Sequence, residues 1–232
     1  MRAKIVVLAN QKGGAGKTTL TMMLAAAFAR AGGKVLVVDA DKQASAQGWA
    51  AAAPDGKPFP AAVAGLLAAP GTLHREILKF ASDYDLILVD CPPSVESTVP
   101  ESAMGIADLV VIPLVPSPVD LASTYGIKEV VMRAMAVRQE RNEQLHALLV
   151  VNMCPSRSKL ARDVRTELES FGLPLATSRI GERTAFRQSF LDGCSVFELR
   201  DHKAREEVEA LAVEIAKIIS FPWKPHVEPQ AA

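Results

Sequence analysis

The residues with the clearest capacity for chemistry lie in a glycine-rich segment near the start of the chain. This segment reads Gln11-Lys12-Gly13-Gly14-Ala15-Gly16-Lys17-Thr18-Thr19, and it stands between an apolar run and a stretch with helical spacing. Glycines let the backbone curl until several N–H groups point at one spot, and the following helix adds its positive amino-terminal end. The segment predicts a phosphate-binding loop in which Lys17 contacts the β- and γ-phosphates, Thr18 ligates Mg²⁺ and Thr19 contacts a phosphate nearer the base.

Three aspartates follow apolar runs and could complete a site for a nucleotide and its metal ion. Asp39 and Asp41 follow the run that begins at Val35, and Asp90 ends the run that begins at Leu86. Ligands of open α/β sheets bind at the carboxyl ends of the strands. We predict that Asp90 holds Mg²⁺ through water, as the aspartate of the second P-loop motif does. Each aspartate alone could also be a helix cap or a surface charge.

The elements that must position these residues are short apolar strands that alternate with helices. Strands this uniformly apolar are typical of a sheet covered on both faces, and right-handed βαβ crossovers are the natural connections. The fold class is therefore α/β, with a doubly wound, mostly parallel sheet flanked by helices. The predicted strands are 5–9, 35–38, 86–89, 109–114, 148–151 and 173–177, and the predicted helices are 18–30, 98–107, 121–141, 159–171 and 201–220.

Length and composition are those of one globular domain. The chain has 232 residues, 49% of them hydrophobic, and its 26 Lys and Arg balance 26 Asp and Glu, which excludes disorder. No apolar run is long enough to span a bilayer, and three cysteines without paired spacing suggest neither a disulfide framework nor a metal site. We expect a single cytoplasmic P-loop domain over 1–220, with a surface excursion of short helices at 50–71, and a frayed, proline-rich tail over 221–232.

A second lysine distinguishes the loop from the standard P-loop pattern. Gln11 replaces that pattern's first glycine, and Lys12 precedes Lys17 on the same loop. The run Lys-Gly-Gly-x-Gly-Lys-Thr-Thr resembles the deviant Walker A motif of the ParA/MinD family of ATPases, and nearly the whole chain is similar to the small ParA members. The resemblance implies ATP and Mg²⁺ as cofactors. It also implies an ATP-bound homodimer in which Lys12 crosses the interface to the partner's ATP.

The resemblance further implies roles for residues outside the loop. In this family the second aspartate after the strand orients the attacking water, so this role falls to Asp41, and Asp39 supports Mg²⁺ through its water shell. Lys42 stands where the family usually has proline, a departure that concerns the shape of the loop. Asn152 resembles the residue that reads the adenine edge, and residues near 183–186 are expected to flank the ring.

Basic residues concentrate in the second half of the chain, which makes it the better candidate for an anionic partner. The resemblance to small ParA proteins implies that the ATP-bound dimer binds double-stranded DNA without sequence preference, in association with the nucleoid, and that a ParB-like adaptor stimulates hydrolysis. Such binding should fall steeply with salt, because phosphate contacts add through counterion release. Each basic residue could instead be a solvated surface charge. The candidate DNA contacts are Arg157, Lys159, Arg162, Arg165, Arg179, Arg183, Arg187, Arg200, Lys203 and Arg205.

Three functions remain open at this point. The first is a weak, partner-stimulated ATPase for plasmid or chromosome partition. The second keeps the ATP switch but positions another cargo, such as a chemoreceptor array, a secretion or conjugation complex or a polysaccharide synthase. The third is a small-molecule ligase or kinase of the dethiobiotin synthetase type, which leaves Lys12 without a role. A membrane-bound cycle is not expected, because the last helix lacks a Lys/Arg-rich polar face.

Overall fold

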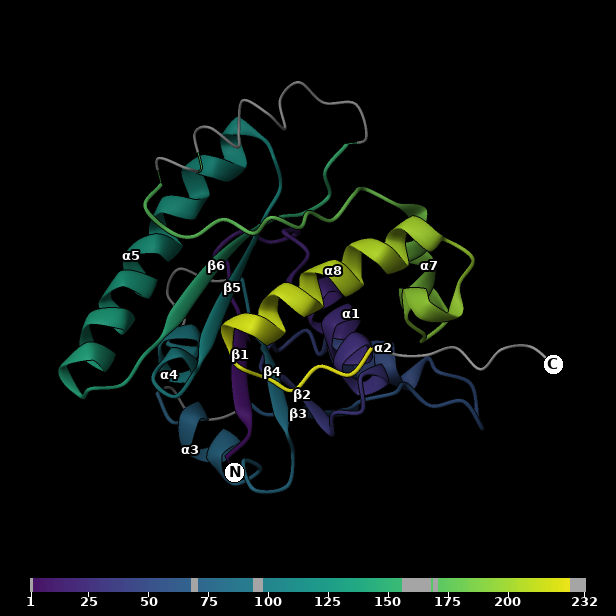
Figure 1. The fold of residues 1–232 in the computed structure, drawn as a ribbon, viewed down its shortest axis with the longest axis horizontal. Coiled ribbons are helices and arrows are strands. Elements are labelled where there is room, and N and C mark those ends of the chain that lie inside the picture. Colours follow the sequence, from purple (N-terminus) through teal and green to yellow (C-terminus); the bar gives the residue numbers. More distant parts are fainter. Residues whose placement is uncertain (1, 68–70, 94–97, 156–167, 169–170, 226–232) are drawn as a thin grey trace.

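A parallel sheet of six strands forms the centre of the molecule (Figure 1). The computed structural model describes residues 2–67, 71–93, 98–155, 168 and 171–225. The strands lie side by side in the order β3-β2-β4-β1-β5-β6, and every neighbouring pair is parallel, which confirms the predicted fold class. Their bounds are Lys4–Leu8 for β1, Val35–Asp39 for β2, Ala62–Gly65 for β3, Leu86–Asp90 for β4, Leu109–Leu114 for β5 and His146–Val151 for β6.

Helices cover both faces of this sheet, so successive side chains of one strand enter two different cores. Val6 and Leu8 of β1 pack on the face covered by α1, α2, α7 and α8. Ile5 and Val7 pack on the opposite face, covered by α3, α4 and α5. Burial on both faces explains why the central strands are apolar without alternation. The helices are α1 Lys17–Arg30, α2 Ser45–Ala51, α3 Leu73–Leu78, α4 Val99–Met104, α5 Pro118–Glu140, α7 Thr184–Leu191, the 3₁₀ helix η1 Val196–Glu198 and α8 His202–Ile218.

The predicted secondary structure is wrong in two places. Residues 62–65 form the edge strand β3 inside the segment expected to be an excursion of short helices. Alanine and glycine are depleted in strands, so the composition gave little sign of this one, which pairs with β2. The predicted strand 173–177 forms only an isolated bridge between Leu149 and Leu175. Pro174 lies inside it and has no N–H to donate to a ladder. The predicted helix 159–171 falls almost entirely outside the described residues.

The start of the predicted tail is packed against the domain. Phe221 is buried, and its ring meets Phe28 of α1 edge-on with centroids 5.1 Å apart. Trp223 meets the same ring at 5.3 Å. The expectation of a frayed segment from residue 221 is therefore wrong for its first residues, because two aromatic side chains bury apolar surface that fraying would expose.

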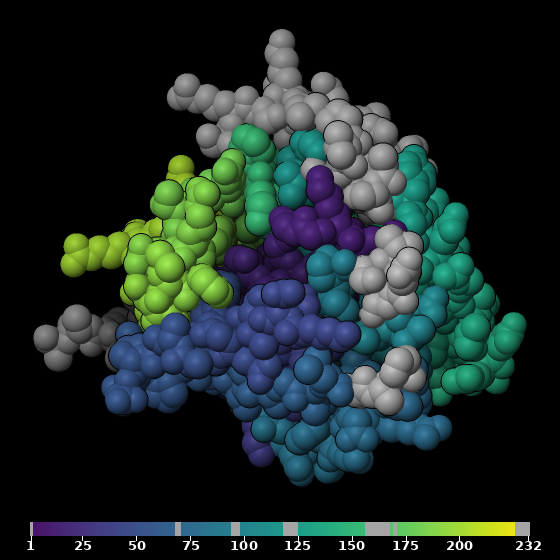
Figure 2. Space-filling model, turned by 180° about the vertical axis from the view of Figure 1, so that it is seen from behind, coloured from purple at the N-terminus to yellow at the C-terminus, as the bar shows by residue number. Residues whose placement is uncertain are grey.

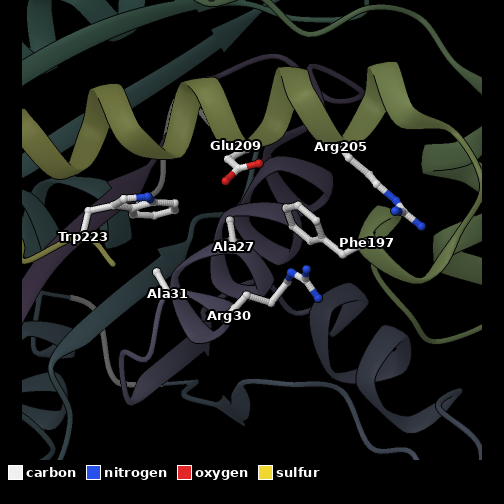
Figure 3. Close-up of a pocket in the computed structure, with 7 residues that line it drawn as sticks. All are labelled: Ala27, Arg30, Ala31, Phe197, Arg205, Glu209 and Trp223. Carbon is white, nitrogen blue, oxygen red and sulfur yellow. The ribbon is translucent and has the colours of Figure 1, made fainter. Parts of the chain in front are cut away.

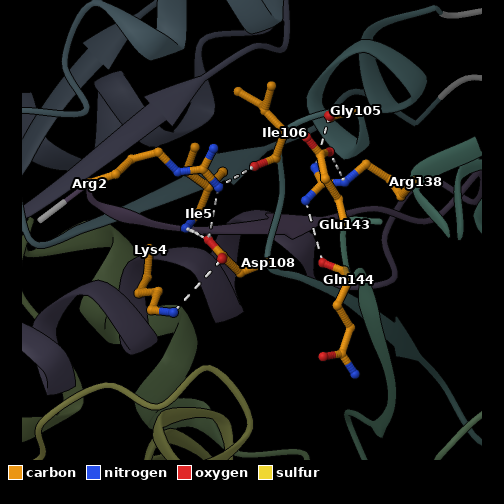
Figure 4. A network of polar contacts seen from close by, with 9 residues as sticks. All are labelled: Arg2, Lys4, Ile5, Gly105, Ile106, Asp108, Arg138, Glu143 and Gln144. Atoms are coloured by element: carbon orange, nitrogen blue, oxygen red, sulfur yellow. Dashed lines mark hydrogen bonds and ion pairs between the residues drawn. The ribbon is translucent and has the colours of Figure 1, made fainter. Parts of the chain in front are cut away.

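An ionic network closes the amino-terminal end of the sheet, opposite the glycine-rich loop (Figure 4). Asp108 accepts a hydrogen bond of 2.7 Å from the Ile5 backbone N–H, and Arg2 and Lys4 lie 3.8 and 3.9 Å from its carboxylate. Beside it, the buried Arg138 donates to the Gly105 carbonyl at 2.8 Å and pairs with Glu143. The charged groups at this end thus have partners within the protein, although the buried Nε of Arg138 pairs with Glu143 without hydrogen-bond geometry.

Candidate functional site

The glycine-rich loop follows β1 and leads directly into α1. Gly14 and Gly16 adopt left-handed backbone conformations, with φ of 77° and 85°, which side chains with a Cβ rarely adopt. Asn10 holds the start of the loop, since its side chain accepts from the Lys12 backbone N–H at 3.1 Å and donates to the Pro113 carbonyl at 2.7 Å. At the other end the Lys17 ammonium donates to the Lys12 carbonyl at 3.2 Å. The loop is therefore curled at the amino-terminal end of a helix, as a phosphate site requires.

Lys17, Thr18 and Asp90 form a group in which the lysine and the aspartate are buried and the threonine is half-buried. The Thr18 hydroxyl donates to the Asp90 carboxylate at 2.6 Å. Burial lowers the pKa of Lys17, although the charge of Asp90 opposes this shift. Burial likewise raises the pKa of Asp90 to about 7, and the hydrogen bond from Thr18 offsets this only in part. Both charges are therefore poorly solvated, and a phosphate and a cation would stabilise them.

The oxygen atoms of this group fit a magnesium ion bound together with phosphates. Mg²⁺ prefers oxygen ligands, and proteins usually hold it through one or two carboxylates while substrate phosphates and water complete the shell. The Thr18 hydroxyl and the Asp90 carboxylate are such donors, and they already lie side by side. Asp90 also lies opposite Asp39 and Leu8 on the neighbouring strands, so all three mark the carboxyl edge of the sheet. The predicted metal-binding roles of Thr18 and Asp90 remain predictions with which this arrangement is compatible.

The two aspartates after β2 have different surroundings. Asp39 is fully buried, and its carboxylate accepts backbone hydrogen bonds from Asp41 at 3.2 Å, Ala46 at 2.9 Å and Gln47 at 3.1 Å. It thus fixes the loop that leads into α2, which is the helix-cap alternative that the sequence left open. Asp41 is only half-buried, and its side chain accepts from the Gln43 N–H at 3.0 Å. The structure brings both near Asp90, whose pKa each raises, and their predicted roles toward Mg²⁺ and water stay predictions.

A cavity of about 550 Å³ opens beside the first residues of α1. In Figure 2 the purple atoms from the start of the chain border the green segment that includes α7 and the blue segment that includes α2. The cavity brings the predicted adenine contacts Asn152, Arg183 and Phe186 together with Thr18 and Thr19. Its remaining lining residues are Ser45, Trp49, Met153, Gly181, Glu182, Arg187, Phe190 and Leu191.

Asn152 joins this cavity to the phosphate loop. Its side-chain amide donates to the Ala15 carbonyl at 2.9 Å, and a Cβ at Gly16 would lie 2.1 Å from the same amide nitrogen. Only glycine allows this approach, which is a reason for Gly16 beyond its backbone conformation. Asn152 therefore positions the loop, and its predicted contact with the adenine edge remains a prediction.

The predicted DNA contacts within the described residues have different surroundings, and their role toward DNA stays a prediction. Arg183 pairs with Glu207 at 2.6 Å, and both Arg183 and Arg187 line the cavity beside Thr18. Arg205 donates to the carbonyls of Val196 and Leu199. The exposed members are Arg179, Arg187, Arg200 and Lys203, whereas Arg157, Lys159, Arg162 and Arg165 lie outside the described residues.

A second cavity, of about 240 Å³, lies between α1 and α8 (Figure 3). Arg30, Phe197, Arg205, Glu209 and Trp223 line it, and the Arg30 guanidinium lies 4.8 Å from the centroid of the Phe197 ring. Arg30 is the last residue of α1, about 20 Å along the helix from the phosphate loop. This cavity therefore belongs to the packing of α8 on α1 and not to the candidate site.

Several residues that shape the site were missed by the sequence interpretation. Asn10 and Thr21 hold the loop and Asp90, and Glu207 and Glu214 of α8 hold the segment 177–183 that borders the cavity. Asn10 could have been noticed, because it directly precedes the loop. The two glutamates gave no signal, because their partners lie more than twenty positions away in the chain.

The fold and the loop together define a P-loop nucleotide-binding protein. Residues 6–196 match the family model described as the CobQ/CobB/MinD/ParA nucleotide binding domain. The chain therefore belongs to this family, whose ParA and MinD members are ATPases, and its cofactors are ATP and Mg²⁺.

Several named proteins are similar to this chain. Maintenance of carboxysome distribution protein A from Halothiobacillus neapolitanus is 32% identical over 217 residues, which cover 92% of this chain and 97% of the relative. The chromosome-partitioning ATPase Soj from Thermus thermophilus is 33% identical over 199 residues, 73% of this chain and 78% of Soj. Cobyrinic acid a,c-diamide synthase from Mycobacterium smegmatis, solved with an ATP analogue and magnesium, shares the fold with a TM-score of 0.70 at 23% identity over 98% of this chain and 100% of that one. Among the described residues, no helix is long and apolar enough to cross a membrane.

Proposed function

We propose that this protein is an ATP-driven switch that positions a protein cargo inside the cell. The proposal rests on the group formed by Lys17, Thr18 and Asp90, to which the same loop adds the second lysine, Lys12. It is favoured by the similarity over 97% of the length of a protein named for carboxysome distribution, against 78% of the length of Soj. In this cycle ATP joins two copies, the dimer holds a cellular surface such as nonspecific DNA, and hydrolysis stimulated by a partner protein releases it.

In this proposal each residue of the site has a separate role in ATP binding or hydrolysis. Lys17 binds the β- and γ-phosphates from a buried position, where a charge–charge interaction is stronger than in water. Thr18 and Asp90 would hold Mg²⁺, which neutralises charge that develops on the phosphates. Asp41 orients the attacking water, and Asp39 keeps Asp41 in place through its backbone hydrogen bonds. Lys12 reaches the nucleotide of the partner copy.

Partition of DNA is the second candidate, because the similarity to Soj is as high in identity although shorter. The two candidates share the ATP switch and differ in the partner that stimulates hydrolysis: an adaptor bound to a protein assembly, or a ParB-like protein bound to DNA. A ligase or kinase of the dethiobiotin synthetase type is not proposed, because it gives Lys12 no task. ATP turnover that requires a small acceptor molecule and ignores DNA would support that rejected function.

Light scattering with ATP and Mg²⁺ tests the switch through its dimer. We expect Asp41→Ala to double in mass with ATP and to stay dimeric, because ATP is no longer hydrolysed. Lys12→Ala, introduced into the same background, should remain a monomer. Lys42→Ala is the matched control, because Lys42 is an exposed lysine of the neighbouring loop, and this variant should still dimerise. A Lys12→Ala protein that dimerises as well as its Lys42→Ala counterpart would refute the proposed role of Lys12.

A further inference from the structure

Helix α8 carries two glutamates that hold the segment 177–183 at the edge of the larger cavity. The Glu207 carboxylate accepts from the Gly181 backbone N–H at 3.0 Å and from two nitrogens of Arg183 at 3.0 and 2.6 Å. Glu214 accepts from the backbone N–H groups of Thr177 at 2.8 Å and Ser178 at 3.1 Å. The two carboxylates are seven positions apart, which places them on one side of the helix.

The segment itself has little regular structure to hold it. On its inner side it bonds to the edge of β6 and the residues after it, through Ile180 N–H to the Val151 carbonyl at 2.9 Å and Cys154 N–H to the Ile180 carbonyl at 2.9 Å. The glutamates of α8 supply acceptors for the N–H groups of Thr177, Ser178 and Gly181, which belong to exposed or half-buried residues. The apolar side of α8, which includes Val208 and Leu211, packs in the same core as α1. Helix α8 thus connects the helix of the phosphate loop to the far wall of the cavity.

Glu207 and Glu214 differ in what they hold. Glu207 binds Gly181 and Arg183, and both of these line the cavity beside Thr18 and Thr19. Glu214 binds Thr177 and Ser178, which do not line it. Two hydrogen bonds fix the plane of the Arg183 guanidinium, and a fixed guanidinium plane is a suitable surface for stacking on a nucleobase.

We propose that Glu207 is a positioning residue for the nucleoside half of the nucleotide, which it serves by holding Gly181 and Arg183 against the cavity. The proposal rests on the proposed function in assigning this cavity to the base and ribose. Glu207 itself does not contact the ligand. It sets the affinity of the site for the part of ATP that the phosphate loop does not bind. Glu214 anchors the same segment but has no such effect.

Calorimetric binding of ATP and of inorganic tripolyphosphate, each with Mg²⁺, tests this division. We expect Glu207→Gln to weaken ATP binding about tenfold, the loss typical of a charge-assisted hydrogen bond, and to change tripolyphosphate binding less than about twofold. Glu214→Gln is the matched control and should leave both affinities within about twofold. Arg183→Lys keeps the positive charge but loses the planar guanidinium. It should also lose affinity for ATP and not for tripolyphosphate, and it replaces Glu207→Gln in the test if that variant does not fold.

Three outcomes would overturn the proposal. They are an unchanged ATP affinity in Glu207→Gln, an equal loss of ATP and tripolyphosphate binding, and an equal effect of Glu214→Gln. Measurements on the wild-type protein and on Lys17→Ala distinguish a failure of the proposed role of Glu207 from a failure of the proposed function. If wild-type protein binds ATP and Lys17→Ala does not, the nucleotide site stands whatever Glu207 does. If wild-type protein binds neither ligand, the proposed function itself fails.

Discussion

The two ends of the central sheet differ in how their charged groups are paired. At the amino-terminal end, Asp108 receives a backbone N–H and two cationic neighbours, and Arg138 reaches the Gly105 carbonyl and Glu143. At the carboxyl end, Lys17 and Asp90 are buried with less compensation, so the pKa of the lysine is lowered and that of the aspartate is raised. At the amino-terminal end the protein's own groups pair with the charges, whereas at the carboxyl end a bound ligand would supply the missing partners.

Because of this difference, we expect the carboxyl end of the sheet to serve ligand binding and the amino-terminal end to serve stability. A buried charge with good partners resists substitution, because removal of one partner leaves the other unsatisfied. A buried charge with poor partners weakens the ligand-free protein and gains most when a ligand of opposite charge binds. We therefore expect changes at the amino-terminal end to affect unfolding, and changes at the carboxyl end to affect binding and the stabilisation that binding brings.

The largest effect should come from removing the buried cation at the carboxyl end. Lys17→Ala is expected to weaken MgATP binding by about a thousandfold or more, because a charge in a poorly solvated site loses its whole interaction with the phosphates. The increase in melting temperature that MgATP gives the wild-type protein should disappear. Lys4→Ala, which removes a lysine from the opposite end, is the control and should keep both. Retained ATP affinity in Lys17→Ala would contradict the assignment of the loop.

The reverse pattern is expected for Arg138 at the amino-terminal end. Arg138→Met should lower the free energy of unfolding by about 2–3 kcal/mol, because the Gly105 carbonyl loses its donor and the paired Glu143 loses its cation. Its ATP affinity should stay that of the wild type. Arg133→Met on the same helix breaks an exposed ion pair with Glu101 and should cost less than about 0.5 kcal/mol. Urea denaturation measures the free energy of unfolding of both variants. Equal losses would show that Arg138 contributes no more to stability than an exposed ion pair does.

The same contrast explains what could be predicted from the sequence. Lys17, Thr18 and Asp90 were found because the phosphate site is built from a contiguous loop and from a residue at the end of an apolar strand. The contact of Arg138 with the Gly105 carbonyl was not found, because the two residues lie 33 positions apart in the chain. The strand β3 was missed for a related reason: its alanines favour helix locally, and pairing with the edge of β2 makes them extended. Long-range pairing, not composition, decides such elements.

The smallest of the expected effects concerns the pH dependence at the carboxyl end. The pKa of Asp90 is about 7 in the ligand-free protein because burial disfavours its charge. The folded state therefore keeps a proton that the unfolded chain releases near pH 4. Release of this proton by the unfolded chain lowers the stability of the folded state as the pH rises from about 4 to 7.

Mg²⁺ requires the ionised Asp90 carboxylate and must displace that proton below pH 7. We expect the affinity for Mg²⁺ in the presence of ATP to fall by up to about tenfold for each pH unit below 7, and to level off above it. Asp90→Asn should bind Mg²⁺ weakly and without this slope. Asp85→Asn, at the other end of β4, keeps the carboxylate at the site and should keep the slope. A wild-type affinity that is flat between pH 6 and 8 would show that the two ends do not differ in the way proposed.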